Sequence, residues 1–192
     1  MIDSDREIID AIRAGNSRRF GALVDRHKDR AMTLAVRLVG ERGEAEELVQ
    51  DAFLRAFRSL DTFRGEAKFS TWFYRILYNV CMTRVSRRKS LPVQEAVEGE
   101  SGEGREWADT DPDIQERMES DEVRQMLAEE ILRLPESFRA ALTLFYVQEL
   151  TYAEMTFVLQ IPPGTVKTNL SRGRSLLRER VLERMNNEVQ SL

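Results

Sequence analysis

Apolar residues recur every three or four positions along most of the chain, which is the spacing of one face of an α-helix. The clearest stripe consists of Ala45, Leu48, Val49, Ala52, Phe53, Ala56, Phe57 and Leu60. Glu44, Glu46 and Glu47 occupy the first turn of this expected helix, where the helix dipole favours negative charge. No segment of the sequence shows the two-residue alternation of a half-buried strand. The pattern therefore predicts an all-α fold.

Helix starts can be placed from capping residues. Ser4 with Glu7, and Thr151 with Glu154, have the spacing of a capping box, in which the two side chains satisfy each other's backbone amides. A further helix is expected to begin near Ser70 and to run through WFYRILYNVCMTRVSRRK. In the second half of the chain, helices are predicted over residues 121–132 and 136–147.

Charge divides the chain into three segments. Residues 1–90 hold 18 Lys and Arg against 13 Asp and Glu, and residues 121–192 hold nine against 10. Residues 91–120 hold only two against 10, include several Gly and Pro residues, and lack a sustained apolar period. This composition is typical of a flexible linker. We therefore predict two small helical domains, at residues 1–90 and 120–192, joined by an acidic linker at residues 91–119.

The second predicted domain contains a helix-turn-helix pattern. The segment Ile161-Pro-Pro-Gly164 interrupts the helical period, and Thr165 can cap the helix that follows. From Gly164 to Arg178 that helix has no acidic residue and carries Lys167, Arg172, Arg174 and Arg178. Thr168, Asn169 and Ser171 add polar groups that can reach base edges in a major groove, while the cations neutralise phosphates. The alternative is an ordinary solvated helix face.

Aromatic and basic residues alternate near the end of the first predicted domain. Phe63, Phe69 and Tyr74 stand among Arg64, Lys68 and Arg75, and a basic run at residues 84–89 follows. Rings that stack on bases, beside cations that meet phosphates, are typical of single-stranded DNA binding. The same rings can belong to the core: we expect Trp72 and Phe73 there, and we leave Phe63, Phe69 and Tyr74 open. Asn79 can bond either a base or internal polar groups.

Other classes of function find little support. Cys81 is the only cysteine, so it cannot form an internal disulfide, and its place in a helix favours packing over reactivity. His27, between Asp25 and Asp29, is expected on a polar helix face. No catalytic, phosphate-binding or metal-binding pattern is evident, so neither enzymatic activity nor a cofactor or metal is expected. The acidic start of the chain and the shortness of its apolar runs favour a cytoplasmic protein.

Together these residues resemble the extracytoplasmic-function sigma factors, the smallest class of the bacterial sigma-70 family. The segment AEELVQDAFLRAFRSLDTFRGEAKFSTWFYRILYNV is similar to the family's second conserved region. The segment LPESFRAALTLFYVQELTYAEMTFVLQIPPGTVKTNLSRGRSLLRER is similar to its fourth region. The resemblance implies a promoter-specificity factor that binds core RNA polymerase and promoter DNA, with a cognate anti-sigma factor as a further partner.

The resemblance also implies roles for three groups of residues. Docking on the clamp helices of the polymerase's largest subunit would fall to Glu46, Glu47, Leu48, Gln50, Asp51, Leu54, Arg55 and Phe57. Minus-ten recognition, including a pocket for a flipped base at residues 63–69, would fall to Phe63, Arg64, Lys68, Phe69, Tyr74, Arg75, Asn79, Arg87 and Arg88. Minus-thirty-five recognition would fall to Thr165, Lys167, Thr168, Asn169, Ser171, Arg172 and Arg174. The acidic linker would pass through the polymerase toward the RNA exit path.

Several positions depart from the common family pattern and leave the promoter sequence open. Asn169 stands where Arg is frequent, Ser171 where a bulkier residue is frequent, and Pro162-Pro163 makes a stiffer turn. Gly173 stands where Ala is frequent, and we expect it to cost up to about 1 kcal/mol relative to Ala. A transcriptional regulator that binds DNA without polymerase is the alternative function, but it does not account for the aromatic segment or the acidic linker.

Overall fold

A computed structural model of the chain describes residues 4–90 and 121–190, and all regular structure in those residues is helical. In chain order the elements are α1 (Asp5–Arg13), η1 (Ser17–Arg19), α2 (Phe20–Val39), α3 (Arg42–Arg58), η2 (Leu60–Thr62), α4 (Phe69–Ser90), α5 (Asp121–Leu132), α6 (Glu136–Leu142), η3 (Thr143–Val147), α7 (Tyr152–Leu159) and α8 (Pro163–Gln190). The all-α prediction is thus confirmed. The predicted linker at residues 91–119 lies outside the described residues.

Local sequence signals account for most helix ends. Ser4 with Glu7 and Thr151 with Glu154 form the two predicted capping boxes. Gly40 ends α2 in the left-handed region (φ 85°), where a residue without Cβ is favoured. Helix α8 begins at Pro163, so Thr165 lies inside it and the prediction of a Thr165 cap is wrong. Pro163 suits the first helical position because that amide needs no intrahelical partner.

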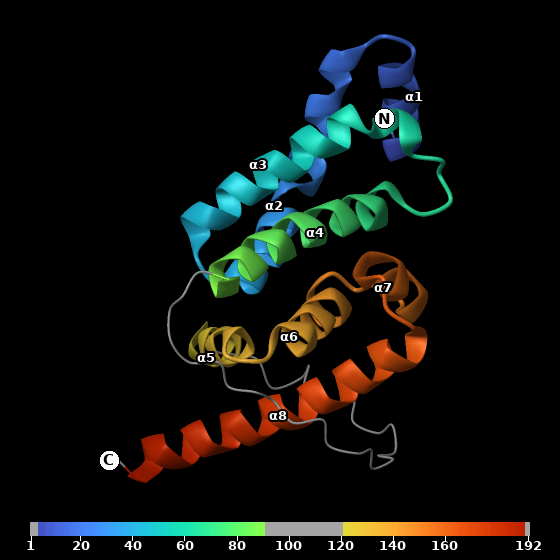
Figure 1. Cartoon of the computed structure of the whole chain (residues 1–192). Coiled ribbons are helices and arrows are strands. Elements are labelled where there is room, and N and C mark those ends of the chain that lie inside the picture. Colours follow the sequence, from blue (N-terminus) through green and yellow to red (C-terminus); the bar gives the residue numbers. More distant parts are fainter. Residues whose placement is uncertain (1–3, 91–120, 191–192) are drawn as a thin grey trace.

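Helices α2, α3 and α4 form the core of the N-terminal bundle, which α1 covers at one end (Figure 1). The stripe predicted for α3 faces inward except at Phe57, which is 41% exposed. Ala45, Ala52 and Ala56 are fully buried, which allows α2 and α4 to approach closely. The ring of Phe53 stacks on that of Phe73 with centroids 4.3 Å apart, joining α3 to α4. Phe73 is therefore core, as predicted, and Trp72 is half-buried against the same cluster. Cys81 is fully buried, which confirms its packing role.

In the C-terminal bundle α5, α6 and α7 pack against the long helix α8. Gly173 lies where α6 crosses α8: a Cβ on Gly173 would stand 3.2 Å from Phe138 Cβ and 3.3 Å from Leu142 Cδ1. The expectation that this glycine only weakens the helix is therefore wrong, because it permits a close approach of two helices. The helix predicted over residues 136–147 is confirmed as far as Leu142, after which the turns widen to a π-helix over Thr143–Val147.

The two bundles contact each other in the free chain. Helix α4 packs along α7, while α2 meets α5, α6 and η3 (Figure 1). Gln148 donates a hydrogen bond through Nε2 to the backbone oxygen of Arg30 at 2.9 Å, with both groups partly buried. Sequence periodicity contains no signal for such contacts, since each bundle satisfies its own helical period.

Candidate nucleic-acid interface

The loop at residues 63–69 is held from below by helix α1. Arg13 donates hydrogen bonds through Nη2 to the backbone oxygens of Leu60, at 3.1 Å, and Phe63. These bonds satisfy carbonyl groups at both ends of η2 and fix the start of the loop. Gly65 adopts φ 75°, a left-handed conformation that glycine enters without penalty and that lets the loop reverse toward α4. The loop is therefore anchored at its start and free to present side chains beyond it.

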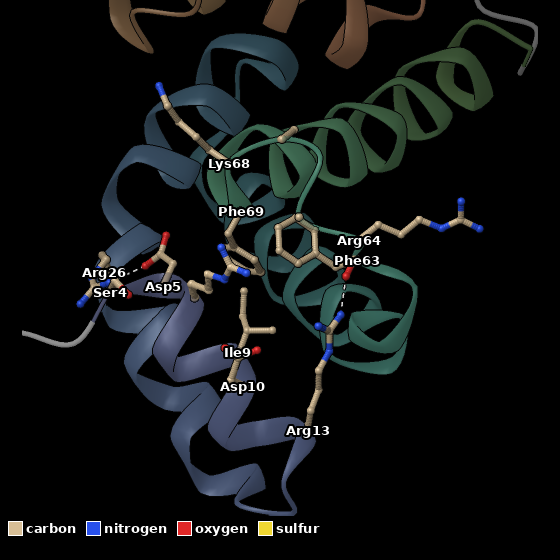
Figure 2. Close-up of a pocket in the computed structure, with 13 residues that line it drawn as sticks. Ser4, Asp5, Ile9, Asp10, Arg13, Arg26, Phe63, Arg64, Lys68 and Phe69 are labelled. Atoms are coloured by element: carbon tan, nitrogen blue, oxygen red, sulfur yellow. Dashed lines mark hydrogen bonds and ion pairs between the residues drawn. The ribbon is translucent and has the colours of Figure 1, made fainter.

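A pocket of about 570 Å³ opens between α1 and this loop (Figure 2). Its floor is apolar, with Ile9, Phe63 and Phe69, and its walls carry five cations against two carboxylates. The charged lining residues are Arg6, Arg13, Arg26, Arg64, Lys68, Asp5 and Asp10. An apolar floor with cationic walls can take a flat aromatic group that carries a negative charge nearby, as a nucleotide does.

The predicted aromatic ligands Phe63 and Phe69 are largely buried in this structure, with exposed fractions of 9% and 2%. Their rings pack edge-to-face, 6.1 Å apart, and Phe69 also stacks on Phe73. They thus form the base of the pocket, and of the two Phe63 has more surface left. Tyr74 is buried at 1% exposure, and this burial raises the pKa of its phenol. In the free chain Tyr74 is a core residue.

His27 supports the pocket from beneath Phe69. Its ring is mostly buried, lies 5.2 Å from the Phe69 ring, and shares a hydrogen bond with Asp5 from Nε2 to Oδ2 at 2.9 Å. Burial lowers the pKa of His27 more than the neighbouring Asp5 carboxylate raises it. The expectation of a polar helix face is therefore wrong, because α1 folds over this side of α2. The pairing with Asp5 spans 22 residues, so the sequence neighbours of His27 could not reveal it.

The other minus-ten candidates lie along the exposed side of α4 and its preceding loop. Arg64, Lys68, Asn79, Arg87 and Arg88 are exposed, and Arg75 is half-buried. Asn79 is exposed, so its side chain does not bond internal polar groups and is available to a ligand. Arg88 is engaged by the buried carboxylate of Glu44 at 2.6 Å, and Arg84 meets the same carboxylate at 3.3 Å. Glu44 was assigned only a helix-dipole role from sequence, and its ion pairs with α4 were missed.

The candidate docking face on α3 combines exposed apolar and charged groups. Leu54 and Phe57 are the exposed large apolar residues of this helix, at 55% and 41%. Arg55 and Asp51 form an ion pair at 2.9 Å beside them. Glu46, Glu47 and Gln50 are also exposed, whereas Leu48 is buried at 4% and belongs to the core. The face therefore offers an apolar pair framed by charges, which suits a protein partner.

The helix-turn-helix consists of α7 and the first turns of α8. Thr165, Lys167, Thr168 and Arg172 are exposed, while Asn169, Ser171 and Arg174 are half-buried. Val166 and Leu170 point into the core and fix the rotation of α8. The guanidinium of Arg174 lies 5.8 Å from the ring centre of Phe145 and 5.9 Å from that of Tyr146. Of the predicted set, the exposed members are thus Thr165, Lys167, Thr168 and Arg172.

The described residues were compared with what a metal site and a membrane-spanning helix require. Residues 4–90 and 121–190 contain no group of three or more His, Cys, Asp or Glu side chains placed to hold a metal ion. None of the helices within those ranges has both the length and the apolar character that crossing a bilayer demands.

Comparison with known proteins agrees with this arrangement. The family model for sigma-70 region 2 matches residues 23–91, and that for sigma-70 region 4 matches residues 124–177. The chain is 34% identical to the RNA polymerase sigma-H factor of Pseudomonas aeruginosa, over 91% of this chain and 92% of that protein. It is 35% identical to the ECF RNA polymerase sigma factor SigW of Bacillus subtilis, over 90% and 94% of the two chains.

Solved structures show the same fold at lower identity. CnrH, in complex with the cytosolic domain of CnrY, matches with a TM-score of 0.64 at 22% identity, over 93% of this chain and 97% of that chain. The sigma factor RpoE of Bartonella quintana, in complex with the anti-sigma factor NepR, matches with a TM-score of 0.62 at 22% identity, over 83% and 94%.

Proposed function

Because this chain belongs to the extracytoplasmic-function group of the sigma-70 family, we propose that its two helical bundles divide promoter recognition between them. As a sigma factor it binds core RNA polymerase and directs transcription initiation. The observation that carries this conclusion is the presence of both conserved regions, in order, in one chain. We assign residues 1–90 to polymerase docking and the minus-ten element, residues 91–119 to a linker, and residues 120–192 to the minus-thirty-five element.

The pocket beside the 63–69 loop is the proposed site for a base flipped out of the minus-ten element. Phe63 supplies a ring at its floor, while Arg64 and Lys68 stand at the exposed edge where phosphates would pass. Capture of an unpaired base offsets the loss of stacking in the duplex. Asn79, Arg87 and the half-buried Arg75 would then follow the same strand along α4. Phe69 and Tyr74, which are buried, would support this surface from within.

The start of α8 is the proposed reading element for minus-thirty-five DNA. Lys167, Thr168 and Arg172 project from the described surface, and no acidic residue interrupts the helix between Gly164 and Arg178. Arg is suited to a bidentate contact with guanine in the major groove. Thr165, Asn169, Ser171 and Arg174 flank them, with Arg174 held against Phe145 and Tyr146.

Two protein partners follow from the proposed function. The α3 face around Leu54 and Phe57 would contact the polymerase, with Glu46, Glu47, Gln50, Asp51 and Arg55 around it. Leu48 would act by holding the helix in place from the core. An anti-sigma factor is the second proposed partner, since both structurally similar chains were solved in complex with a second protein, which in one case is named an anti-sigma factor. We place this chain, with its polymerase, in the cytoplasm.

Transcription with purified components tests the proposal. The chain is added to core RNA polymerase with a library of promoter fragments, and transcripts are sequenced. Discrete transcripts that depend on the chain, and that share two spaced sequence elements, are expected. Failure to bind polymerase, together with tight binding of the chain alone to duplex DNA, would favour a regulator that acts without polymerase.

A further inference from the structure

Helix α1 forms a fixed wall behind the pocket described above. Asp5, at its first position, pairs with Arg26 and shares a hydrogen bond with His27 of α2 at 2.9 Å. Ile8 and Ile9, one turn later, are buried in the core of the N-terminal bundle. The position of α1 is thus set by its contacts with α2, and a side chain at the far end of α1 reaches the loop from a rigid support.

Both hydrogen bonds that Arg13 donates to the loop come from one nitrogen, Nη2. One is accepted by the Leu60 carbonyl at 3.1 Å and the other by the Phe63 carbonyl. The Leu60 carbonyl also accepts a hydrogen bond from the Phe63 amide, at 3.1 Å, so the guanidinium joins the two ends of the η2 turn. Hydrogen bonds from a charged donor are stronger than those between neutral groups. Arg13 therefore clamps the turn from which the 63–69 loop departs.

The clamped Phe63 carbonyl sets the course of the loop beyond it. This carbonyl belongs to the planar peptide unit that leads into Arg64, so a hydrogen bond to its oxygen fixes the direction in which the chain leaves η2. Figure 2 shows the Arg13 side chain reaching up from α1 to this oxygen. The Phe63 ring is held separately, with its centre 5.2 Å from the Trp72 ring and 6.1 Å from the Phe69 ring. Backbone and ring of the pocket floor thus depend on different contacts.

Resting on the proposed function, we infer that Arg13 is a positioning residue for minus-ten recognition, which holds the 63–69 loop in the shape that accepts a flipped base. It acts through the Leu60 and Phe63 carbonyls, from a helix that precedes the residues matched by the region 2 model. Because both hydrogen bonds are only partly buried, water can replace Arg13 and the bundle stays folded without it. The loop then samples more conformations, and affinity for the base falls with the fraction that fits it.

Helix α1 offers a matched control for the charge of Arg13. Arg6 lines the same pocket and is exposed, but in the described structure it donates no hydrogen bond to the loop. Arg13→Met and Arg6→Met remove the same charge from the same pocket, whereas only Arg13→Met removes the clamp. Arg13→Lys keeps the charge and a nitrogen that can donate to two carbonyls. The three variants therefore separate loop positioning from attraction of phosphates.

Hydrogen exchange of the full chain, followed by mass spectrometry, tests the clamp without DNA or polymerase. Arg13→Met should speed exchange of amides within residues 60–69 by about threefold or more, while amides of α2 and α3 keep their wild-type rates. Arg6→Met should match the wild type throughout, and Arg13→Lys should lie between the wild type and Arg13→Met.

Binding of single-stranded DNA to the holoenzyme tests the role of Arg13 in base capture. The probe is a labelled non-template strand of a promoter selected in the transcription experiment above, with each minus-ten base replaced in turn by an abasic site. In the wild type, the abasic site at the captured base should weaken binding by about fivefold or more, since a stacked base contributes at least that factor. Arg13→Met should reduce this penalty to below about twofold, and Arg13→Lys should restore most of it. Arg6→Met should weaken all oligonucleotides alike and keep the full penalty.

The outcomes separate the role of Arg13 from the proposed function. Unchanged exchange within residues 60–69 of Arg13→Met would overturn the clamp. An abasic penalty as large in Arg13→Met as in Arg6→Met would overturn the role in base capture. A wild-type holoenzyme without an abasic penalty at any position would count against the proposed base pocket itself, whereas the exchange rates would still decide whether Arg13 orders the loop.

Discussion

Replacing Gly173 by alanine isolates the packing of α6 on α8, because two opposite effects meet at this position. Within a helix, alanine is favoured over glycine by about 1 kcal/mol. Here, however, the new Cβ would lie 3.2 Å from Phe138 Cβ and 3.3 Å from Leu142 Cδ1. The Leu142 side chain can rotate away, but the Phe138 Cβ moves only with the α6 backbone. Overpacking of this kind costs about 1–3 kcal/mol.

We therefore expect Gly173→Ala to lower the free energy of unfolding by about 1 kcal/mol, which corresponds to a Tm reduction of about 4–8 °C for a small domain. Gly164→Ala is the matched control: it lies on the same helix, and its Cβ would meet no atom within 4 Å. It should stabilise the chain by up to about 1 kcal/mol. Thermal melts followed by circular dichroism, with hydrogen exchange at α6 and α8 amides, give the comparison. If both substitutions stabilise equally, the close approach of α6 to α8 is refuted.

Four further predictions concern the site and its supports. Arg172→Ala should weaken promoter binding by about 1–3 kcal/mol; equal loss on scrambled DNA would reduce Arg172 to a phosphate contact. Leu54→Ala with Phe57→Ala should lower affinity for core polymerase by at least about tenfold, since apolar anchors dominate interfaces, while the free chain stays folded and loses only the edge-to-face contact of Phe57 with Phe20; unchanged pull-down would reject the α3 face. Because the pKa of His27 is lowered in the folded state, the unfolded chain binds more protons, and the free energy of unfolding should fall as the pH drops below about 6.5. In urea titrations at pH 7.5 and 5.5, His27→Gln should lose less free energy of unfolding between the two pH values than the wild type. Equal losses in the two proteins would contradict this role of His27. Burial raises the pKa of Cys81 to about 12, so a thiol reagent at pH 8 should react only after denaturation; rapid reaction of the native chain would show an opening not present here.

Features that depend on local order could be predicted from the sequence. The α3 stripe, both capping boxes and the break at Ile161–Gly164 depend on neighbours within a helical turn or two. The interruption before α8 was therefore predicted correctly at Ile161 and Pro162, but Pro163 and Gly164 already belong to the helix. Local periodicity also predicted that the Phe73 ring is buried and that the Trp72 ring packs against the core.

Features that depend on contacts between residues far apart in the sequence could not be predicted from it. Arg13 supports a loop 50 residues later, and Glu44 meets cations 40 and 44 residues away. Gly173 looks like a weak helix residue until α6 is placed against it. Glu154 is recognisable as a capping residue, but its contacts with Lys68 and Thr71 arise only when the two bundles meet. Such residues carry two roles, of which the sequence reveals the local one.

Footprinting of the holoenzyme on a promoter selected by this chain tests the central claim most directly. Chemical protection should appear at two elements, one of them lost with Arg172→Ala, and permanganate should modify unpaired thymines only at the element nearer the transcript start. That result would place duplex reading by α8 and strand capture by the 63–69 loop on one promoter. Protection of duplex DNA without reactive thymines, or protection unchanged when core polymerase is omitted, would contradict the division of promoter recognition between the two bundles.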